Sequence, residues 1–379
     1  MSFLRRVAQK IGRRRKAADE PLLLMTAAKR IVELENNESR PPLLVCDGVL
    51  SDGTHSLFRA WKTQPVTIRQ YELHDVILDR SLMVFIQNGR PIVDTSYLQA
   101  PDLVTNLTIR PQDLVLAPRG QTVMAATFDH WHKNYYHWLA HTVPTLFTLR
   151  TQNFKGNLIL PPVYPWQEEM LRAEKFAFQN QEIVQDGKQY CFKRALYTDY
   201  VRGTADFAFS PISAAAYRAL AKEMGITGHE PQNLELFIRR GDATNRSMSN
   251  ESELTDALAR LGLTVVSPET LSVREQVHLF AQARLVVGSL GAGMANLAWC
   301  RPGTVVCELV PEHHQNPCTL ALATQMGLRY WGELVETGID TENHVSISLK
   351  PFDVAAITHR VQQLSAYARQ YAVRGEGAE

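Results

Sequence analysis

The sequence lacks the features that mark several large classes of protein. No apolar run in its 379 residues approaches the ~20 residues that cross a bilayer, so we expect no membrane-spanning segment. The formal net charge of +1 argues against a dedicated nucleic-acid-binding protein. The five cysteines are odd in number and show no paired metal spacing, which indicates buried thiols in a reduced cytoplasm.

Two short motifs are also missing. No Asp-x-Asp occurs anywhere, so the chain has no short carboxylate clamp for a metal bound to a diphosphate. The glycines of the C-terminal half are spaced Gly288-x-x-Gly291-x-Gly293, and no acidic residue ends the following strand at the usual place. This spacing is not the dinucleotide-binding fingerprint, which excludes a nicotinamide-dependent enzyme.

What is present is a regular alternation of strand-like and helix-like patterns in the C-terminal half. The expected strands lie at 234–238, 263–266, 285–287, 304–309 and 328–331, and the expected helices at 250–261, 272–281, 292–300 and 316–326. This alternation predicts an α/β fold, with a parallel sheet covered by helices on both faces. Ligands of such sheets bind at the carboxyl ends of the strands.

The loop after the strand at 285–287 is the first candidate site. Backbone N–H groups at a glycine turn that opens a helix bind anions, most often phosphates. Arg240, Arg246 and the Gly291–Gly293 turn are therefore predicted to bind a diphosphate. Glu308, at the end of a later strand, is predicted to accept hydrogen bonds from ribose hydroxyls. The alternatives are glycines that only allow a tight turn and charged side chains that face solvent.

A run of polar aromatic residues from Asp129 to His141 is the second candidate site. His137 and His141 are four residues apart, so on a helix they share one face. They could be a metal-ligand pair, although no third ligand is in sight and the glutamate of a His-Glu-x-x-His motif is absent. They could also be structural histidines. A third interpretation is acid–base catalysis, because the pKa of histidine lies near working pH.

The N-terminus departs from the balanced charge of the rest. Residues 1–16 carry a cluster of basic side chains, with Phe3, Leu4, Val7 and Ile11 on one helical face. Such a segment can lie on an anionic membrane surface, and a disordered basic tail is the alternative. We expect four parts of the chain. They are a basic amphipathic segment at 1–20, an N-terminal domain at 21–210, a C-terminal nucleotide-binding domain at 211–350, and a helix with a loose tail at 351–379.

Taken in order, the motifs resemble those of glycosyltransferase family 61 over about residues 120–330. They are Asn134–Leu139 with Pro144, Phe237–Arg240 with Arg246, Asn250-Glu251, Glu275-Gln276, the glycine turn with Asn296, Pro302-Gly303 and Glu308-Leu309. The resemblance implies a GT-B fold, in which two Rossmann-like domains face each other across a cleft. The domain at 21–210 would then be the acceptor-side domain, and the domain at 211–350 would bind the nucleotide sugar. It also implies an inverting transfer of a sugar from a nucleotide sugar to a glycan or lipid-linked acceptor, without a metal or other cofactor. The expected setting is cell-surface polysaccharide or capsule biosynthesis, in the cytoplasm or peripherally on the inner face of the plasma membrane.

The resemblance also assigns residues. It implies that His141, or else His137, is the catalytic base, and that a C-terminal helix packs back across the first domain. The donor-binding residues it implies are Arg240, Arg246, Asn250, Glu251, Gly291, Ala292, Gly293, Asn296 and Glu308.

The sequence departs from the family pattern at two positions. Leu290 stands where a histidine is common, and His141 where an acidic residue is common. A non-catalytic glycan- or nucleotide-binding partner is therefore an alternative function. Another nucleotide-dependent transferase, such as a pyruvyl or phosphoryl transferase, is a further one.

Overall fold

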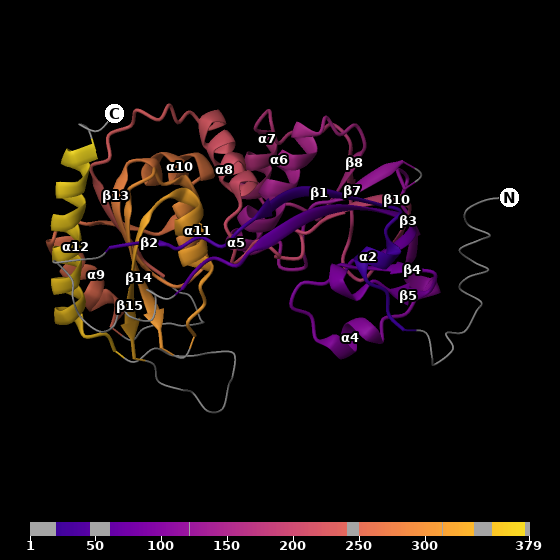
Figure 1. The fold of residues 1–379 in the computed structure, drawn as a ribbon, viewed down its shortest axis with the longest axis horizontal. Helices are drawn as coiled ribbons and strands as arrows, with labels where there is room; N and C mark the ends of the chain where they lie inside the picture. Colours follow the sequence, from indigo (N-terminus) through magenta and orange to yellow (C-terminus); the bar gives the residue numbers. More distant parts are fainter. Residues whose placement is uncertain are drawn as a thin grey trace. The chain divides into compact units, whose positions relative to one another are not determined.

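The computed structural model describes residues 20–45, 61–120, 122–240, 250–312, 314–336 and 351–375. The chain divides into two compact units. Unit 1 is Met1–Asn37 with Val66–Ala205, and unit 2 is Glu38–Pro65 with Asp206–Glu379. Both units combine helices with parallel strands, which confirms the predicted α/β class (Figure 1). The basic segment at 1–16 and Arg246 lie outside the described residues.

Unit 1 is built on a mixed sheet. Its described strands are β1 (Arg30–Asn37), β3 (Val66–Asp79), β4 (Val84–Gln87), β5 (Arg90–Pro91), β6 (Leu114–Leu116), β7 (Val123–Ala126), β8 (Asn157–Leu160), β9 (Gln181–Ile183) and β10 (Gln189–Thr198). They follow the order β5-β4-β3-β10-β7-β8-β9, with β1 beside β3 and β6 beside β10. The helical segments are α2 (Leu24–Ala27), η2 (Val93–Thr95), α4 (Pro101–Thr105), η3 (Pro111–Asp113), α5 (Tyr135–His137), η4 (Trp138–Thr142), α6 (Val143–Thr151) and α7 (Pro165–Arg172).

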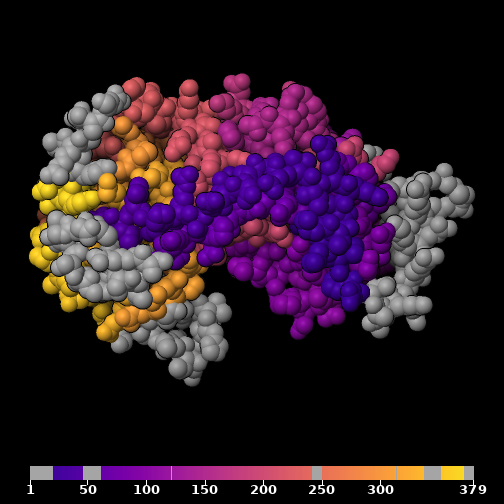
Figure 2. All heavy atoms as spheres, viewed as in Figure 1, coloured from indigo at the N-terminus to yellow at the C-terminus, as the bar shows by residue number. Residues whose placement is uncertain are grey.

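The mixed sheet of unit 1 differs from the Rossmann-like domain that the family resemblance implies. β10 is parallel to β6 and β7, and β7, β8 and β9 are parallel to one another. The long strand β3 instead runs antiparallel to β1, β4 and β10. The short connection from β3 to β4 forms a hairpin, and a hairpin forces antiparallel pairing. β1 lies at the surface of this unit, where its indigo atoms are visible in Figure 2.

Unit 2 is built on the parallel sheet that the sequence predicts. Its described strands are β2 (Leu43–Leu44), β11 (Leu234–Ile238), β12 (Thr264–Val266), β13 (Ala283–Ser289), β14 (Val305–Pro311) and β15 (Arg329–Val335). Its helical segments are α8 (Pro211–Glu223), α9 (Glu251–Arg260), η5 (Pro268–Thr270), α10 (Val273–Ala281), η6 (Ala292–Trp299), α11 (Cys318–Met326) and α12 (Val354–Gly375). The segment after Gly291 is thus a 3₁₀ helix rather than an α-helix.

The strand order of unit 2 points to one end of the sheet as a binding region. The order is β12-β11-β13-β14-β15-β2, with every neighbouring pair parallel. From β11 the chain goes first to β12 on one side and then to β13 on the other, so the order reverses between β11 and β13. Such a reversal leaves a crevice at the carboxyl ends of the two strands, where ligands of open α/β sheets bind.

Helix α12 packs on the sheet of its own unit. We expected this helix to pack back across the first domain, but Val361 and Leu364 instead share a core with Leu285 and Val287 of β13. Buried Glu235 of β11 accepts a hydrogen bond from Ser365 of α12 at 2.7 Å. Arg284 and Arg369 complete the ion-pair cluster of Glu235. A buried carboxylate needs such partners, and here they fasten the helix to the strand.

Most of the described cysteines are buried thiols, as expected. Cys191, Cys300 and Cys307 are buried, Cys318 is half-buried, and Cys46 lies outside the described residues. Burial raises the pKa of Cys191 to about 11, so this thiol stays protonated and unreactive. In the part of the chain that the structure describes, no helix has the length and apolar character to cross a bilayer.

Candidate active site

The candidate site in unit 1 starts at the carboxyl end of β7. Three residues beyond this strand, Asp129 is buried with 2% of its surface exposed. The backbone N–H of Trp131 donates to Asp129 Oδ1 at 2.5 Å. Thr127, in the same connection, donates its hydroxyl to the carbonyl of Ile159 on β8. The strand ends and these bonds hold the carboxylate in place, with Oδ2 left for other donors.

The two histidines come from the helix that follows. Asn134 caps α5 by accepting a hydrogen bond from the N–H of Tyr136 at 2.9 Å. The helix then passes through the single π-turn η4 before α6. Pro144 has no N–H to donate to the preceding turn, and one π-turn accommodates it. His137 lies at the end of α5 and His141 lies within the π-turn.

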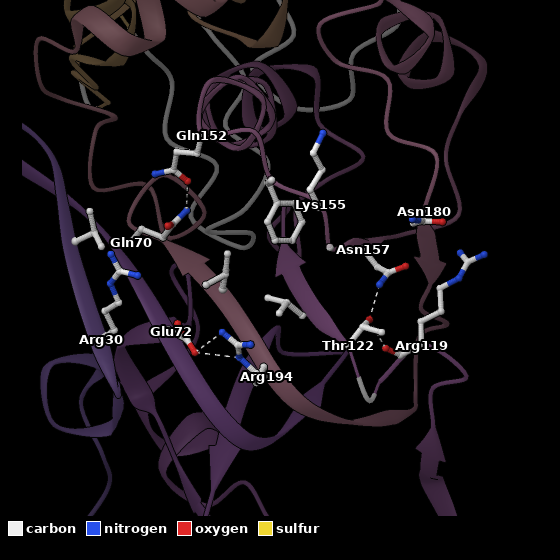
Figure 3. Close-up of a pocket in the computed structure, with 15 residues that line it drawn as sticks. Arg30, Gln70, Glu72, Arg119, Thr122, Gln152, Lys155, Asn157, Asn180 and Arg194 are labelled. Carbon is white, nitrogen blue, oxygen red and sulfur yellow. Dashed lines mark hydrogen bonds and ion pairs between the residues drawn. The ribbon is translucent and has the colours of Figure 1, made fainter.

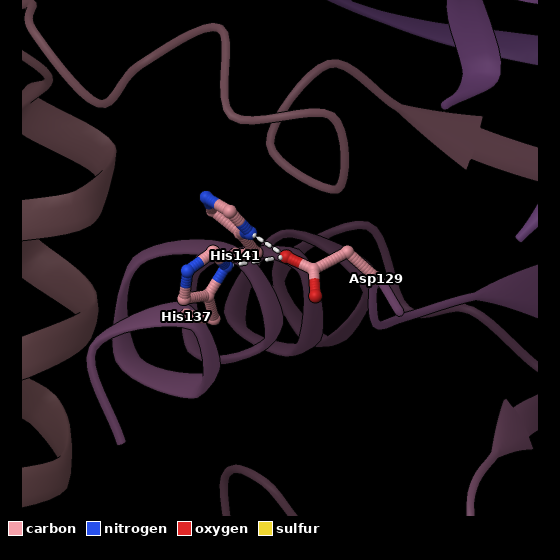
Figure 4. A group of neighbouring side chains, drawn as sticks. All are labelled: Asp129, His137 and His141. Carbon is pink, nitrogen blue, oxygen red and sulfur yellow. Dashed lines mark hydrogen bonds and ion pairs between the residues drawn. The ribbon is translucent and has the colours of Figure 1, made fainter. Parts of the chain in front are cut away.

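Asp129, His137 and His141 form one hydrogen-bonded cluster (Figure 4). Nδ1 of His137 lies 2.9 Å from Asp129 Oδ2, and Nδ1 of His141 bonds to the same oxygen. The two imidazole rings are nearly perpendicular, with centroids 5.1 Å apart. The ring of Tyr97 packs against both at 5.0 Å. The structure therefore brings together the two histidines that the sequence singled out.

The electrostatics of the cluster decide which nitrogen carries the proton. Burial raises the pKa of Asp129, but the adjacent His141 and His137 lower it more, so the net pKa lies well below its usual value. An ionised carboxylate only accepts hydrogen bonds, so both Nδ1 atoms must donate. In the neutral form of either imidazole the lone pair is then on Nε2, which is the nitrogen that can accept a proton. The side chain of His137 is 13% exposed and that of His141 only 1%.

The same three residues meet the geometric requirement for a metal site. Their ligand atoms all lie within 4.8 Å of one another, and Asp129 supplies the third ligand that the sequence did not reveal. A metal bound through Nδ1 of either histidine would need the lone pair of that atom, which the hydrogen bond to Asp129 instead occupies with a proton. The hydrogen-bonded and metal-bound arrangements thus compete for the same atoms.

Aromatic and basic side chains surround the cluster. Trp131 is 52% exposed, and its ring centroid lies 6.2 Å from that of His137. His132 is buried, and its Nδ1 has no hydrogen-bond partner among the described residues. Burial, followed by the charge of Arg80, lowers the pKa of His132 to about 4. His132 is therefore neutral at pH 7.

The candidate site in unit 2 lies where the strand order reverses, between β11 and β13. Arg240 follows β11, and its Nη1 donates to the carbonyl of Leu290 at 2.6 Å. The N–H of Arg240 donates to Oε1 of Glu251 at 2.6 Å. A Cβ on Gly291 would overlap Nη1 of Arg240. The structure thus joins Arg240, Glu251 and Gly291, and a side chain at Gly291 would displace the Arg240 guanidinium from the turn.

The other expected donor-binding residues have partners within the fold. Asn296 is fully buried, and its side chain bonds to Gly293 O and to the indole N–H of Trp299. Glu308 is 1% exposed and accepts a hydrogen bond from the Tyr330 hydroxyl at 2.5 Å.

The remaining expected residues lie either in the turn or against a later segment of the same chain. The Asn250 side chain both donates to and accepts from the backbone of Phe352. Ala292 and Gly293 are partly exposed in the first turn of η6. The backbone at this turn, with Arg240, is therefore the part of the predicted site that remains accessible.

Two residues of the unit 1 site, Asp129 and Tyr97, had no predicted role. Asp129 did carry a signal, because it follows directly on a β-type run in the way that ligand-binding carboxylates end parallel strands. Tyr97 carried none, since it lies 32 residues before Asp129 in an irregular stretch and reaches the histidines only through the fold.

One of the comparisons with known proteins finds a family. No curated protein matches the sequence. Among solved structures, a mutant flavo di-iron protein from Thermotoga maritima aligns with 84% of this chain and 94% of its own, at 10% identity and a TM-score of 0.27, which is too weak to support an inference. Residues 135–307 match the family model described as Glycosyltransferase 61. That span includes His137, His141, Arg240 and the glycine turn, and this chain therefore contains a glycosyltransferase family 61 domain.

Proposed function

We propose that the protein is an inverting, metal-independent glycosyltransferase that moves a sugar from a nucleotide sugar to a glycan or lipid-linked acceptor. The transferase class follows from the family, and the observation that carries the mechanism is the cluster of Asp129, His137 and His141. Asp129 fixes both imidazoles with Nε2 as the basic nitrogen, which is what general-base catalysis needs.

In the proposed reaction an acceptor hydroxyl gives its proton to Nε2 of His137. The hydroxyl oxygen attacks the anomeric carbon from the side opposite the nucleotide, so the configuration inverts. The bond from that carbon to the diphosphate breaks, and the diphosphate leaves with the electron pair. Asp129 stabilises the imidazolium that forms. The larger exposure of His137 makes it the proposed base, with His141 as a positioning residue behind it.

Unit 2 is proposed to hold the donor. Its supporting features are the reversal of strand order between β11 and β13 and the Arg240 guanidinium over the Gly291 turn. Arg240 and Arg246, with the backbone N–H groups of the turn, would neutralise the diphosphate without a cation. The GT-B arrangement, the acceptor role of unit 1 and a role in cell-surface polysaccharide synthesis belong to the same proposal. So do a cytoplasmic location and an anionic membrane contact through residues 1–16.

The exposed indole of Trp131 fits the acceptor side of this proposal. An aromatic face next to a base offers an apolar surface for the C–H face of a sugar ring, whose hydroxyls remain free for polar contacts. Trp131 lies beside His137, and its backbone is held by Asp129. An acceptor sugar stacked on this indole would meet the base without further rearrangement.

The test is a thermal-shift panel of nucleoside diphosphates and nucleotide sugars, followed by a donor-hydrolysis assay with the donor that binds. A ligand at 100 times its Kd should stabilise the protein by ~2.7 kcal/mol, a shift of several degrees. Arg240→Ala should lose the shift, while His137→Ala should keep it and lose turnover. No shift with any nucleotide in a folded sample would contradict the proposal.

A non-catalytic binding partner is the second candidate. The observation in its favour is that His141, at a position where the family commonly has an acid, is buried against Asp129. Such a protein would bind one nucleotide in the thermal-shift panel. It would neither hydrolyse the nucleotide sugar nor transfer its sugar to any acceptor.

A further inference from the structure

A basic basin lies on unit 1, at the opposite end of β7 from Asp129 (Figure 3). Its floor is one face of the sheet formed by β1, β3, β10 and the start of β7, and its rim is the turn between α6 and β8. The volume is about 940 Å³, which is in the range of sites that bind whole ligands. All of its lining residues belong to unit 1.

The basin has more positive than negative charge. Its charged lining residues are Arg30, Arg119, Lys155, Arg194 and Glu72. Glu72 pairs with Arg194 at 2.8 Å, which leaves the other three cations without an acidic partner. Among the described residues, the side chains of Arg30 and Lys155 make no hydrogen bond or ion pair, and Arg119 donates only to a backbone carbonyl. An anionic ligand is therefore the complementary one.

The rest of the lining suits a polyhydroxylated ligand. Amide side chains of Gln70, Gln152, Asn157 and Asn180 line the basin, and the first two hydrogen-bond to each other at 3.0 Å. Amides both donate and accept, as sugar hydroxyls do. Phe154 adds an aromatic face to the rim, against which the apolar face of a sugar can pack.

The basin and the catalytic cluster lie on the same face of the sheet. Gln70 in the basin stands opposite Thr198 in the pairing of β3 with β10, and Thr198 bonds to Thr145 of α6 at 2.9 Å. Thr145 also donates to the carbonyl of His141. Helix α6 thus connects the two, with His141 before its first turn and Gln152 at its end, roughly 17 Å apart along the helix.

We propose that this basin binds an acidic saccharide, that is, a carboxylate-bearing segment of the acceptor glycan away from the end that receives the new sugar. The identification of this saccharide as the acceptor rests on the proposed function, but the binding of an acidic saccharide does not. Arg30, Arg119 and Lys155 bind the carboxylates, the amides bind hydroxyls, and Phe154 packs against a ring. A neutral glycan would leave the three cations without counter-charges and would bind more weakly.

The test is calorimetric titration of the full chain with hexagalacturonate as the acidic probe. The double variant Arg30→Gln/Lys155→Gln should weaken binding by about 10²-fold, or about tenfold for each charge-assisted contact. A carboxyl-reduced hexamer of the same length should bind the wild type no better than it binds the variant.

A matched control changes the net charge by the same amount as the basin variant does. Lys193→Gln/Arg172→Gln removes two cations from unit 1 outside the basin, since Lys193 points to the opposite face of β10 from Arg194 and Arg172 pairs with exposed Glu168. This variant should bind the probe within about twofold of the wild type. Equal weakening by both double variants would mean that net charge alone attracts the probe. Unchanged binding by the basin variant would also overturn the proposal.

Donor hydrolysis without acceptor separates this inference from the proposed function. The basin variant should hydrolyse donor at the wild-type rate and show a raised KM for an acidic acceptor only. If the wild-type protein binds hexagalacturonate but turns over no donor, the proposed role of the basin is supported and the transferase mechanism is refuted. Normal sugar transfer by a protein that does not bind hexagalacturonate would support the transferase mechanism and refute the proposed role of the basin.

Discussion

The candidate site of unit 1 is made of side chains, whereas that of unit 2 is made mainly of backbone. Around Asp129, two imidazoles from one helix meet one carboxylate and have their protons fixed by it. Around Gly291, the accessible groups are peptide N–H groups and one guanidinium that itself bonds to a carbonyl. The polar side chains expected there, Asn296 and Glu308, bond within the fold.

This difference matches the two halves of the proposed reaction. Taking a proton requires a group whose protonation changes, and only a side chain such as imidazole supplies it near neutral pH. Holding a diphosphate requires fixed positive potential, which a glycine turn and an arginine provide without titrating. Substitutions in unit 1 should therefore alter proton transfer, and substitutions in unit 2 should alter nucleotide binding and leaving-group stabilisation.

The largest effect is expected for His137→Ala, which should lower kcat by about 10³-fold because the base is lost. Asp129→Asn should have a similar effect, since the amide cannot stabilise the imidazolium. The double variant should be no worse than the more damaging single one, because the residues act as a unit. Steady-state kinetics with a saturating donor would measure this. The matched control, His229→Ala at an exposed histidine of unit 2, should change nothing.

The result for His141→Ala assigns the roles within the cluster. As a positioning residue it should shift the pH profile of kcat and lower kcat less than His137→Ala does. If turnover survives His137→Ala and disappears in His141→Ala, His141 is the base and its low exposure in the structure does not describe the reacting state.

The second prediction concerns Arg240→Ala, which should slow transfer by about 10²-fold if its contact strengthens as the diphosphate leaves. Arg239→Ala is the matched control, because Arg239 is the exposed neighbour at the same strand end. A melting curve should accompany the kinetics, since Arg240 also bonds to Leu290. Wild-type rates in a folded Arg240→Ala protein would show that Arg240 does not bind the diphosphate.

The two units also differ in how far their folds could be predicted. In unit 2 the strands from β11 to β15 pair with strands nearby in the chain, so local patterns and the alternation rule predicted this part of the sheet correctly. In unit 1, Leu73 of β3 pairs with Ala195 of β10, more than a hundred residues away, and no local pattern shows such a partner. The short strand β2 likewise joins unit 2 from residues 43–44, through pairing with β15.

For the candidate sites the order is the opposite, because the site of unit 1 could be predicted better than that of unit 2. The histidines of unit 1 could be found because they lie four apart in one helix, and helical spacing alone brings them together. Glu308 could not be assigned, because its partner Tyr330 comes from the neighbouring strand. Burial, followed by the charge of Glu308, raises the pKa of Tyr330, so the hydroxyl keeps its proton for this bond. A sequence does not show which carboxylates at strand ends have such an internal donor.

A third prediction places acid sensitivity in unit 1. The pKa of His132 is about 4 in the folded protein because of burial, against about 6.5 in the unfolded chain. Between these values the unfolded chain binds more protons, so stability falls as pH drops from about 6.5 to about 4. We expect a loss of roughly 2 kcal/mol after allowing for solvent screening. Urea unfolding at several pH values would measure it, and His132→Gln should flatten the slope while His229→Gln should not.

The smallest expected effect is that of metal removal, which should leave transfer unchanged. Both Nδ1 atoms of the cluster donate to ionised Asp129, so a cation bound through these atoms would have to displace two protons and two charge-assisted hydrogen bonds. Dialysis against EDTA, metal analysis of the protein and the transfer assay would test this together. If activity disappears and one divalent ion restores it with stoichiometric binding that Asp129→Asn abolishes, the cluster is a metal centre. In that case the two units would not differ in the way proposed here, because unit 1 would act through the positive charge of a bound cation, as unit 2 acts through the positive charge of its arginine and glycine turn.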